Sequence, residues 1–441
     1  MSEDTEPEGD AEGDADATAT DADATATDAD ATATDADAGA TGISAVGRGA
    51  WVAIAGLFVL STAAGAYEIS PASVTTEIIA DLGIGRGAAG AIISVMYAVA
   101  VVASVPIGAA LDRTDLRRAV VVASLALLLA GLAGWLAAAA GSFLALLATR
   151  VLGGLAYVTI WNAGANLAAR SAPPGLRATA VGIFTASAPA GFALGQLAGP
   201  VVAGWAGWPA IFVTFGSLAT VGLALFLLGS RRQRREGTEE PAPDTPSTEE
   251  FFAVLRARGV WLICGMGFAS YALYLFVNSW LPSYFTEEFG LSLAESGLLV
   301  AVFPAVGIVS RTAGGVISDR IFGGRRRPVA LGSFLATGPL VVALGFVGNI
   351  AAALVLLVVS GAALQLGIGL LFSYVREVVD EAVAATAISM LTGVGLLGAL
   401  VAPVAAGSLI EATGSYDLAF LAAGAVAAAG VALALLSPEP G

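Results

Sequence analysis

The stretch Gly108-Ala-Ala-Leu-Asp112-Arg113-Thr-Asp115-Leu-Arg117-Arg118 ends one long apolar run and opens the next. About two hundred residues later the pattern returns as Gly315-Val-Ile-Ser-Asp319-Arg320-Ile-Phe-Gly-Gly324-Arg325-Arg326-Arg327. Each copy has a glycine, an Asp-Arg pair four and five positions later, and an arginine cluster before the next apolar run. Two copies in matching places predict a chain built from two related halves.

The repeat extends well beyond this stretch. Thr179-Ala-Val-Gly returns as Thr386-Ala-Ile-Ser, at the same separation as Asp112 and Asp319. The series Gly195, Gly199-Pro200 and Gly204 likewise returns as Gly398, Ala402-Pro403 and Gly407. An equal separation across unrelated-looking segments indicates a duplicated architecture.

The composition predicts an integral membrane protein. Of the 441 residues, 57% are apolar and only 12% are charged, and the mean hydropathy is +0.83. A soluble domain needs more charge on its surface. Twelve apolar runs approach the roughly 20 residues that a spanning helix needs. They lie at about 50–75, 88–110, 119–139, 143–167, 178–200, 209–229, 259–281, 295–317, 329–348, 350–373, 385–407 and 417–436.

These runs divide the chain into two sets of six. We predict an acidic disordered tail at 1–47, a bundle at 48–229, a flexible linker at 230–258, a second bundle at 259–436 and a short tail at 437–441. Fourteen of the 35 acidic residues lie in the first forty positions, mostly in Asp-Ala-Thr repeats without an apolar stripe. High charge without apolar content is typical of disorder.

The basic residues predict the orientation. All 20 are arginine, and a cytoplasmic N-terminus places seventeen of them on the cytoplasmic side, with only Arg86 outside. The chain has no histidine and a single Cys264 in an apolar run, so we expect no metal site and no cofactor. It also lacks a phosphate-binding loop and a Ser/His/Asp set, so we expect neither an enzyme nor a nucleic-acid-binding protein.

Two six-helix halves, a central loop and the duplicated Gly-xxx-Asp-Arg loop resemble the major facilitator superfamily over about residues 48–436. The resemblance implies an all-α integral membrane fold with 12 transmembrane helices in two pseudo-symmetric bundles. It also implies a secondary transporter whose site lies near mid-membrane between the repeats. The acidic tail, the lack of lysine and a pI near 4.4 resemble proteins of halophilic archaea.

Glu68 is the one acid that we place well inside a helix of the first half. It shares a face with Ser61 and Gly65, just before Pro71. One interpretation is a proton-binding carboxylate. The alternative is that the helix ends near Tyr67 and leaves Glu68 solvated at the outer rim.

Arg150 starts a face that continues with Gly154, Tyr157 and Trp161 at i+4, i+7 and i+11. Its Arg-xxx-Gly pattern resembles the family's helix-4 motif, which is tied to proton coupling in proton-driven antiporters. We hypothesise an ion pair between Arg150 and Glu68 that protonation breaks. The alternatives are a permanent structural pair or an arginine that extends to the outer surface.

Arg311 lies in the middle of the eighth run, without an obvious acidic partner in its own half. A guanidinium grips carboxylate-like anions with two parallel bonds, which favours an anion site. Anion carriers of the family often carry an arginine here, and those for nitrate and nitrite pair it with another in helix 2, where this chain has Ser104. The alternative is a hydrogen-bonded structural arginine.

Further cavity candidates lie on the seventh and tenth runs. Tyr271, Tyr274 and Asn278 share one face, followed by Trp280-Leu-Pro282, which resembles an ending of helix 7 in organic-anion branches. Gln365 is a buried amide candidate in helix 10. The aromatic residues equally fit an interfacial belt, and such amides are often bonded across a helix interface.

The opening motif itself predicts a cytoplasmic gate. An aspartate at a helix end can face the positive N-terminus of a helix from the other bundle. By the resemblance, Asp112 would face the start of helix 11 and Asp319 the start of helix 5, near Thr179. The predicted gate residues are Gly108, Asp112, Arg113, Arg117, Arg118, Gly315, Asp319, Arg320, Arg325 and Arg326.

The sequence therefore predicts a monomeric secondary transporter of the cytoplasmic membrane, driven by H⁺ or Na⁺. A symporter or exchanger of a small organic or inorganic anion is favoured by Arg311. A proton-coupled exporter of drugs or apolar metabolites is the alternative, supported by Glu68, Arg150 and the helix-5 glycines. A transporter-like sensor or scaffold is the candidate from another class.

Overall fold

The structure is a computed structural model that describes residues 48–111, 113–172, 176–230 and 248–439. These described residues all belong to one compact unit. The predicted acidic tail, most of the predicted linker and Asp112 lie outside the described residues.

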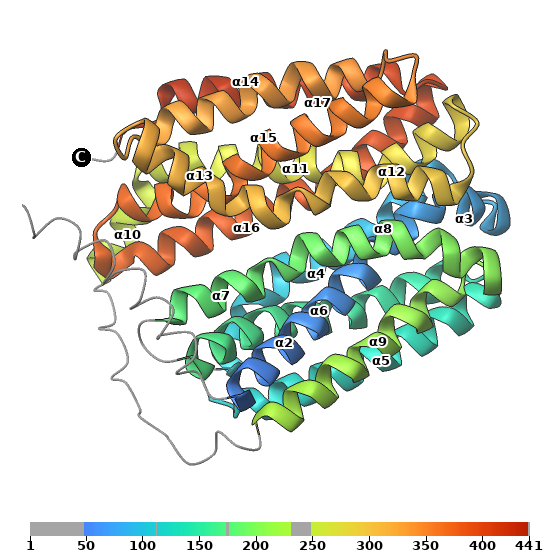
Figure 1. Cartoon of the computed structure of the whole chain (residues 1–441), viewed down its shortest axis with the longest axis horizontal. Helices are drawn as coiled ribbons and strands as arrows, with labels where there is room; N and C mark the ends of the chain where they lie inside the picture. The colour runs from blue at the N-terminus through green and yellow to red at the C-terminus, as the bar shows by residue number, and fades with distance from the viewer. Residues whose placement is uncertain (1–47, 112, 173–175, 231–247, 440–441) are drawn as a thin grey trace, which may run out of the picture. The chain divides into compact units, whose positions relative to one another are not determined.

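The described residues of the first half form eight α-helices, with the 3₁₀ helix η1 between the first two of them (Figure 1). They are α2 (Arg48–Ile69), η1 (Ser70–Val74), α3 (Thr75–Leu82), α4 (Arg86–Leu111), α5 (Leu116–Ala139), α6 (Phe143–Ser171), α7 (Arg177–Thr185), α8 (Ser187–Ala206) and α9 (Ala210–Ser230). Here Asp115 of the opening motif caps α5, because its carboxylate accepts the backbone N–H groups of Arg117 and Arg118.

The second half repeats the plan. It contains α10 (Thr248–Arg256), α11 (Arg258–Glu288), α12 (Leu293–Ala305), α13 (Gly307–Ile321), α14 (Arg326–Leu344), α15 (Ile350–Glu377), η3 (Glu381–Val383), α16 (Ala384–Thr413) and α17 (Asp417–Leu436). A capping box of Ser292 and Glu295 fixes the start of α12, and Asn349 caps α15. Figure 1 shows the blue-to-green half and the yellow-to-red half as two bundles.

The described residues contain twelve helical segments long and apolar enough to cross a membrane, which confirms the predicted fold class. Three of them combine consecutive helices: Arg48–Leu82, Thr179–Ala206 and Leu293–Ile321. The first changes direction at η1, where Pro71 cannot continue the hydrogen-bonding pattern of α2. The third is interrupted between α12 and α13, next to Pro304.

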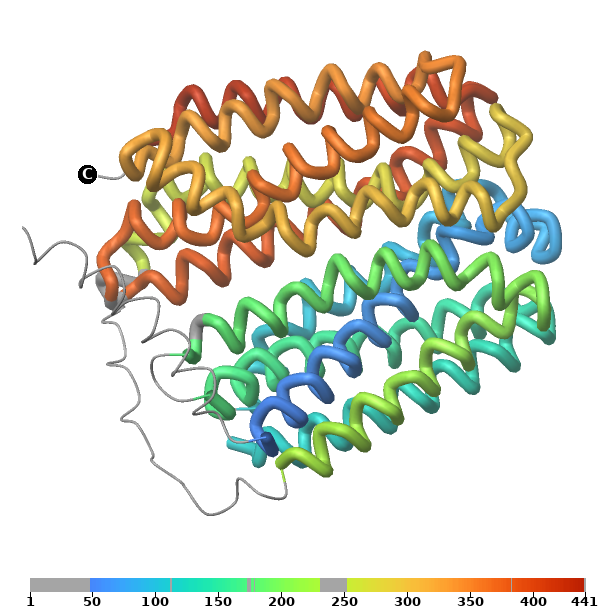
Figure 2. The backbone as a smooth tube through the Cα atoms, viewed as in Figure 1, coloured from blue at the N-terminus to red at the C-terminus, as the bar shows by residue number. Residues whose placement is uncertain are grey.

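The two bundles meet along two pairs of helices. Helix α4 packs against α16, and α8 packs against α12. In addition, η1 contacts α11 and α12, and Figure 2 shows this blue segment beside the yellow start of α12. We call the end of the molecule where α2 begins and α17 finishes the termini end, and the opposite one the far end.

Candidate functional site

Arg150 is fully buried in α6, so it does not extend to the outer surface. Its Nε donates to the Ile92 carbonyl at 2.9 Å, and its two Nη atoms donate to the carbonyls of Tyr67 at 2.8 Å and Glu68 at 2.6 Å. The guanidinium also lies over the Tyr67 ring, 4.7 Å from its centroid. Arg150 therefore joins α6 to α4 and to the last turn of α2, where backbone carbonyls are free to accept.

Glu68 is the next-to-last residue of α2 and is only 1% exposed. The alternative of a solvated residue beyond an early helix end is therefore wrong. Its carboxylate lies beside the hydroxyls of Tyr97 and Tyr157, but neither of its oxygens has a hydrogen bond of ordinary geometry. A buried carboxylate without such a partner is costly, so Glu68 destabilises this bundle unless another group compensates it.

The hypothesised Glu68–Arg150 ion pair is not formed in this structure. Arg150 binds the backbone carbonyl of Glu68, while the Glu68 carboxylate remains unpaired. The physical reason is that backbone carbonyls use all three nitrogens of the guanidinium. Two of these carbonyls, those of Tyr67 and Glu68, lie at the end of α2, and the third is that of Ile92 within α4.

Arg311 lies in α13 on the opposite side of the bundle interface and is partly buried. Its Nε donates to Gln365 Oε1 at 3.1 Å, and its guanidinium lies 5.5 Å from the centroid of the Tyr274 ring. No described carboxylate forms an ion pair with it. Arg311 therefore carries an uncompensated positive charge inside a membrane-spanning segment.

Tyrosine side chains connect the two charged residues. Arg311 lies within electrostatic range of Tyr157, Tyr271 and Tyr274. Glu68 interacts with Tyr97, Tyr157 and Tyr274. The structure thus brings Glu68, Tyr157, Tyr271, Tyr274, Arg311 and Gln365 together from both halves. We call these residues, with Tyr97, the central cluster.

Other predicted residues have different surroundings. Trp161 packs against Phe184 of α7, with ring centroids 5.3 Å apart. Asn278 bonds the Tyr274 carbonyl of its own helix, and its backbone carbonyl accepts from Gln196 Nε2 at 2.6 Å. Asn278 therefore belongs to the contact between α11 and α8. Ser104 donates to the Ala100 carbonyl within α4.

A charged contact at the far end, formed by Arg86, Glu287 and Tyr416 and called the clasp below, was not predicted from the sequence. Arg86 of α4 binds Glu287 of α11 through both carboxylate oxygens, at 3.0 and 2.7 Å. The Tyr416 hydroxyl accepts from Arg86 at 2.9 Å and donates to Glu287 at 3.1 Å. Burial and the Glu287 carboxylate raise the pKa of the Tyr416 phenol, which keeps this donor protonated. The only sequence signal was that Arg86 is isolated from all other arginines.

The backbone reinforces this clasp. The Gly87 N–H donates to the Glu411 carboxylate of α16 at 3.1 Å. Gly90 lies against the Pro403 carbonyl and Gly297 against the Gln196 carbonyl, so closely that neither position has room for a Cβ. The bundles are therefore in direct contact at the far end.

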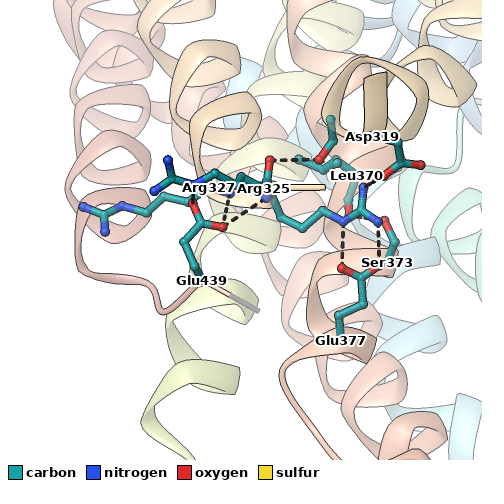
Figure 3. Close-up of polar contacts among 9 residues, drawn as sticks. Asp319, Arg325, Arg327, Leu370, Ser373, Glu377 and Glu439 are labelled. Carbon is teal, nitrogen blue, oxygen red and sulfur yellow. Dashed lines mark hydrogen bonds and ion pairs between the residues drawn. The ribbon is translucent and has the colours of Figure 1, made fainter. Parts of the chain in front are cut away.

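The predicted gate residues of the second half lie at the termini end, where they form a network within their own bundle (Figure 3). The Arg326 guanidinium binds Asp319 at 2.6 Å and both oxygens of Glu377 at 2.7 Å. The Glu439 carboxylate accepts the backbone N–H groups of Arg326 and Arg327 at the start of α14. Arg320 and Arg325 are exposed.

Asp319 does not contact the start of α7 in this structure, and the predicted latch, which belongs to the outward-open state, stays a prediction. No hydrogen bond or ion pair joins it to the described residues of α7, and Arg326 takes its carboxylate instead. Gly108 and Gly315 have no atom within 4 Å of an added Cβ, so the two bundles leave space beside both motif glycines. In the first copy, Arg113 and Arg118 are exposed and Arg117 is partly buried.

Comparisons with known proteins agree with this architecture. The profile of the Major Facilitator Superfamily matches residues 53–390 and 277–441. A solved bacterial homolog of the human lysosomal transporter Spinster, described as inward-facing and unoccupied, superposes with a TM-score of 0.71 at 19% identity, covering 88% of this chain and 94% of that one.

Curated relatives are described as transporters of anions. A probable sulfoacetate transporter of Cupriavidus necator is 35% identical over 191 residues, which is 42% of this chain and 44% of that protein, so less than half of its length is covered. A cis,cis-muconate transport protein of Acinetobacter baylyi is 28% identical over 300 residues, covering 64% of this chain and 70% of that protein. A nitrite extrusion protein of Bacillus subtilis is 27% identical, with 56% and 60% covered. The chain is a multi-pass membrane protein that belongs to the Major Facilitator Superfamily.

Proposed function

We propose that this chain is a secondary transporter that carries a small anion across the cytoplasmic membrane by alternating access to the central cluster. The observation that carries the proposal is Arg311, a partly buried guanidinium without a carboxylate partner among the described residues. A positive charge in a membrane interior is costly unless something compensates it. A bound anion supplies that compensation.

The relatives support the same substrate class. The proteins printed as carriers of sulfoacetate, cis,cis-muconate and nitrite differ in size and shape, but all of these compounds are anions. Unlike the nitrate and nitrite carriers that the sequence analysis considered, this chain has Ser104 where a second arginine would lie. One central guanidinium can neutralise one charged head group of such a cargo.

The arginine distribution supports a cytoplasmic termini end, since the sequence assigns seventeen of its 20 arginines to the loops and tails of that side. With that orientation, the far-end clasp closes the outer side, and the state seen here is open toward the cytoplasm. Transport then requires the clasp to break and the gate residues to meet. The protein acts as a monomer in this proposal, because one chain supplies both halves of the cluster.

We further propose that a proton accompanies the anion and binds Glu68. An ionised carboxylate without hydrogen bonds is strongly disfavoured in a buried site, so this state holds Glu68 as the neutral acid. The side chains of Tyr157 and Tyr274 interact with both Glu68 and Arg311. In this proposal, an anion bound at Arg311 favours a neutral Glu68 by charge repulsion across these two tyrosines.

The exporter of apolar compounds is less well supported. The helix-5 glycines that favoured it are used in packing, because Gly195 lies against Ile69 and Ala66 of α2 and Gly199 against Ser73 of η1. The sensor or scaffold alternative finds no support among relatives that are described as transporters.

The test of the anion site is uptake into liposomes that contain the full chain. We expect uptake of sulfoacetate, cis,cis-muconate or nitrite by the wild type, and a loss of at least about tenfold in Arg311→Ala, since a charge-assisted contact is worth roughly 1.5–3 kcal/mol. Arg170→Ala is the control, because it removes an exposed arginine from the last turn of α6, outside the gate residues. Undiminished uptake of every transported anion by Arg311→Ala would place the anion site elsewhere.

The test of coupling uses the same liposomes with an imposed pH gradient. Wild-type protein should accumulate the anion toward the alkaline side, whereas Glu68→Gln should equilibrate it without accumulation, because the amide mimics the protonated acid. A Glu68→Gln protein that still accumulates anion in response to the gradient would rule out Glu68 as the proton site, without affecting the role of Arg311.

A further inference from the structure

The break between α12 and α13 leaves a backbone carbonyl inside the second bundle without a backbone N–H donor. Helix α12 ends at Ala305 directly after Pro304, and α13 begins at Gly307. No described backbone N–H donates to the Phe303 carbonyl, which an uninterrupted helix would have satisfied. A buried carbonyl needs a partner, and here a side chain from another helix supplies it.

That side chain is Gln365 of α15, which is fully buried. Its Nε2 donates to the Phe303 carbonyl at 2.8 Å and to the Pro304 carbonyl at 3.3 Å. Because the amide nitrogen must face these two acceptors, the amide oxygen must face the other way. It accepts from Arg311 Nε at 3.1 Å.

Two glycines allow this close arrangement. An added Cβ at Gly307 would collide with the Gln365 amide, and one at Gly369 would collide with the Arg311 carbonyl. Helices α13 and α15 therefore approach each other through Gly307 and Gly369. The Gln365 amide is held tightly, and it can hold the Arg311 guanidinium in turn.

The contacts of Arg311 define which of its edges remains available. Gln365 takes Nε, which blocks the side edge of the guanidinium, and the Tyr274 ring lies against the guanidinium at 5.5 Å. Neither Nη atom has a hydrogen-bond partner among the described residues, so the terminal edge of the fork is free. The nearby Tyr274 hydroxyl is a second buried group without a partner.

From this geometry we infer that Gln365 is a positioning residue, which turns the terminal edge of Arg311 toward the cargo and makes the site selective for planar two-oxygen head groups. A carboxylate or nitrate offers a separate oxygen to each of the two parallel N–H groups of that edge, whereas a spherical anion of the same charge must share one atom between both groups and aligns poorly with each. The inference rests on the proposed function and adds the shape of the anion that Arg311 selects.

The experiment measures thermal stabilisation of the purified full-length chain by acetate, nitrate and bromide at constant ionic strength. Nitrate and bromide carry the same charge and similar size, so their comparison isolates shape. For the wild type we expect half-maximal stabilisation at about tenfold lower concentration of acetate or nitrate than of bromide, the difference that one additional charge-assisted hydrogen bond supports.

Gln365→Met keeps the approximate volume but removes the amide, and Gln365→Asn keeps an amide that is too short to bridge. Both should bring the nitrate-to-bromide ratio to within about twofold of one, while bromide itself stabilises as before, because the charge of Arg311 remains. Gln365→Glu should abolish stabilisation by all three anions, since its carboxylate would pair with Arg311. Ser360→Ala, a buried control on the same helix, should leave the ratio unchanged.

The outcomes separate this inference from the proposed function. If Arg311→Ala is stabilised by all three anions as the wild type is, the anion site itself is wrong. If Arg311→Ala loses stabilisation but Gln365→Met and Gln365→Asn retain the full nitrate preference, Arg311 binds the anion and the positioning role of Gln365 is wrong. A loss of response to bromide as well in the folded Gln365→Met protein would also contradict positioning.

Discussion

The two ends of the bundle interface are built differently although the sequence repeat makes the halves alike. At the far end, Arg86 and Gly87 of the first half bind Glu287, Tyr416 and Glu411 of the second. At the termini end, the motif residues Asp319 and Arg326 bind only within their own half. The repeated Asp-Arg motif thus lies at the end where these described residues bind within one half, and the charged residues that join the halves at the far end lie outside that motif.

The surroundings of individual glycines show the same difference between the far end and the termini end. Gly90 and Gly297 touch backbone of the opposite half, whereas Gly182, Gly315 and Gly393 have no atom within 4 Å of an added Cβ. Tight glycine contacts across an interface exist only where two helices are pressed together. The difference between the two ends is therefore a property of this conformation. Substitutions at the far end should act on the state in which that end is closed, and substitutions at the termini end on the state in which the termini end is closed.

The largest effect should come from Gly297→Ala. The new methyl group would lie 2.8 Å from Pro200 Cγ and closer still to the Gln196 carbonyl, so the far end cannot close as it does here. The population should move almost completely to a state with the far end open. Spin labels at the exposed positions Ala80 and Glu288, in a Cys264→Ala background, measure the separation of the two halves there.

Gly315→Ala is the matched control for Gly297→Ala. It lies in the same spanning segment, but at the termini end, where the added methyl group meets nothing. It should leave the label distances unchanged. A wild-type distance distribution for Gly297→Ala would show that the far end closes by a different packing from the one described.

An intermediate effect should follow from removing the clasp. The Arg86 and Glu287 side chains are 26% and 30% exposed, so their pair contributes about 1 kcal/mol, less at high salt. Arg86→Gln or Glu287→Gln should raise the far-end-open population by roughly fivefold. The same labels, with Ala80 and a neighbouring α11 position in place of Glu288, measure it at low and high ionic strength.

A double-mutant cycle decides whether the clasp acts as a unit. Arg86→Gln combined with Glu287→Gln should shift the population no further than either change alone, because each already removes the pair. Additive shifts, or shifts that do not weaken in salt, would mean that the two residues act through separate contacts.

The sequence predicted the fold because helices in a membrane follow from local composition. Apolar runs of sufficient length gave all twelve spans, and the duplicated motif gave the two-half organisation. Polar residues in those runs were few enough that Arg311, Gln365 and the tyrosines could be assigned to one cluster. Charge and hydropathy suffice for such predictions because the bilayer tolerates few exceptions.

Pairwise contacts were not predictable in the same way. The Glu68–Arg150 pair was a reasonable expectation from charge, but the carbonyls at the end of α2 took the guanidinium. Arg86 and Glu287 are 201 positions apart, and nothing in either local sequence indicates the other. Such contacts depend on how the two bundles dock against each other. A transporter docks its bundles in at least two arrangements, and this structure shows one of them.

The smallest effect, and one of opposite direction, should come from Asp319→Asn. Asp319 is 58% exposed in its pair with Arg326, and Arg326 keeps both oxygens of Glu377 without it, so the state seen here loses little stability. If Asp319 faces the start of α7 when the termini end closes, the substitution weakens only that other state, by about 0.3–1 kcal/mol. The population seen here should then increase by roughly two- to fivefold, which labels at the exposed residues Thr114 and Ile321 can measure.

Arg326→Gln separates the two roles of the aspartate, because it breaks the present pair and frees Asp319 for α7, and should shift the population the other way. Equal shifts in the same direction from Asp319→Asn and Arg326→Gln would mean that their pair is merely structural, and that the repeated motif does not form the gate.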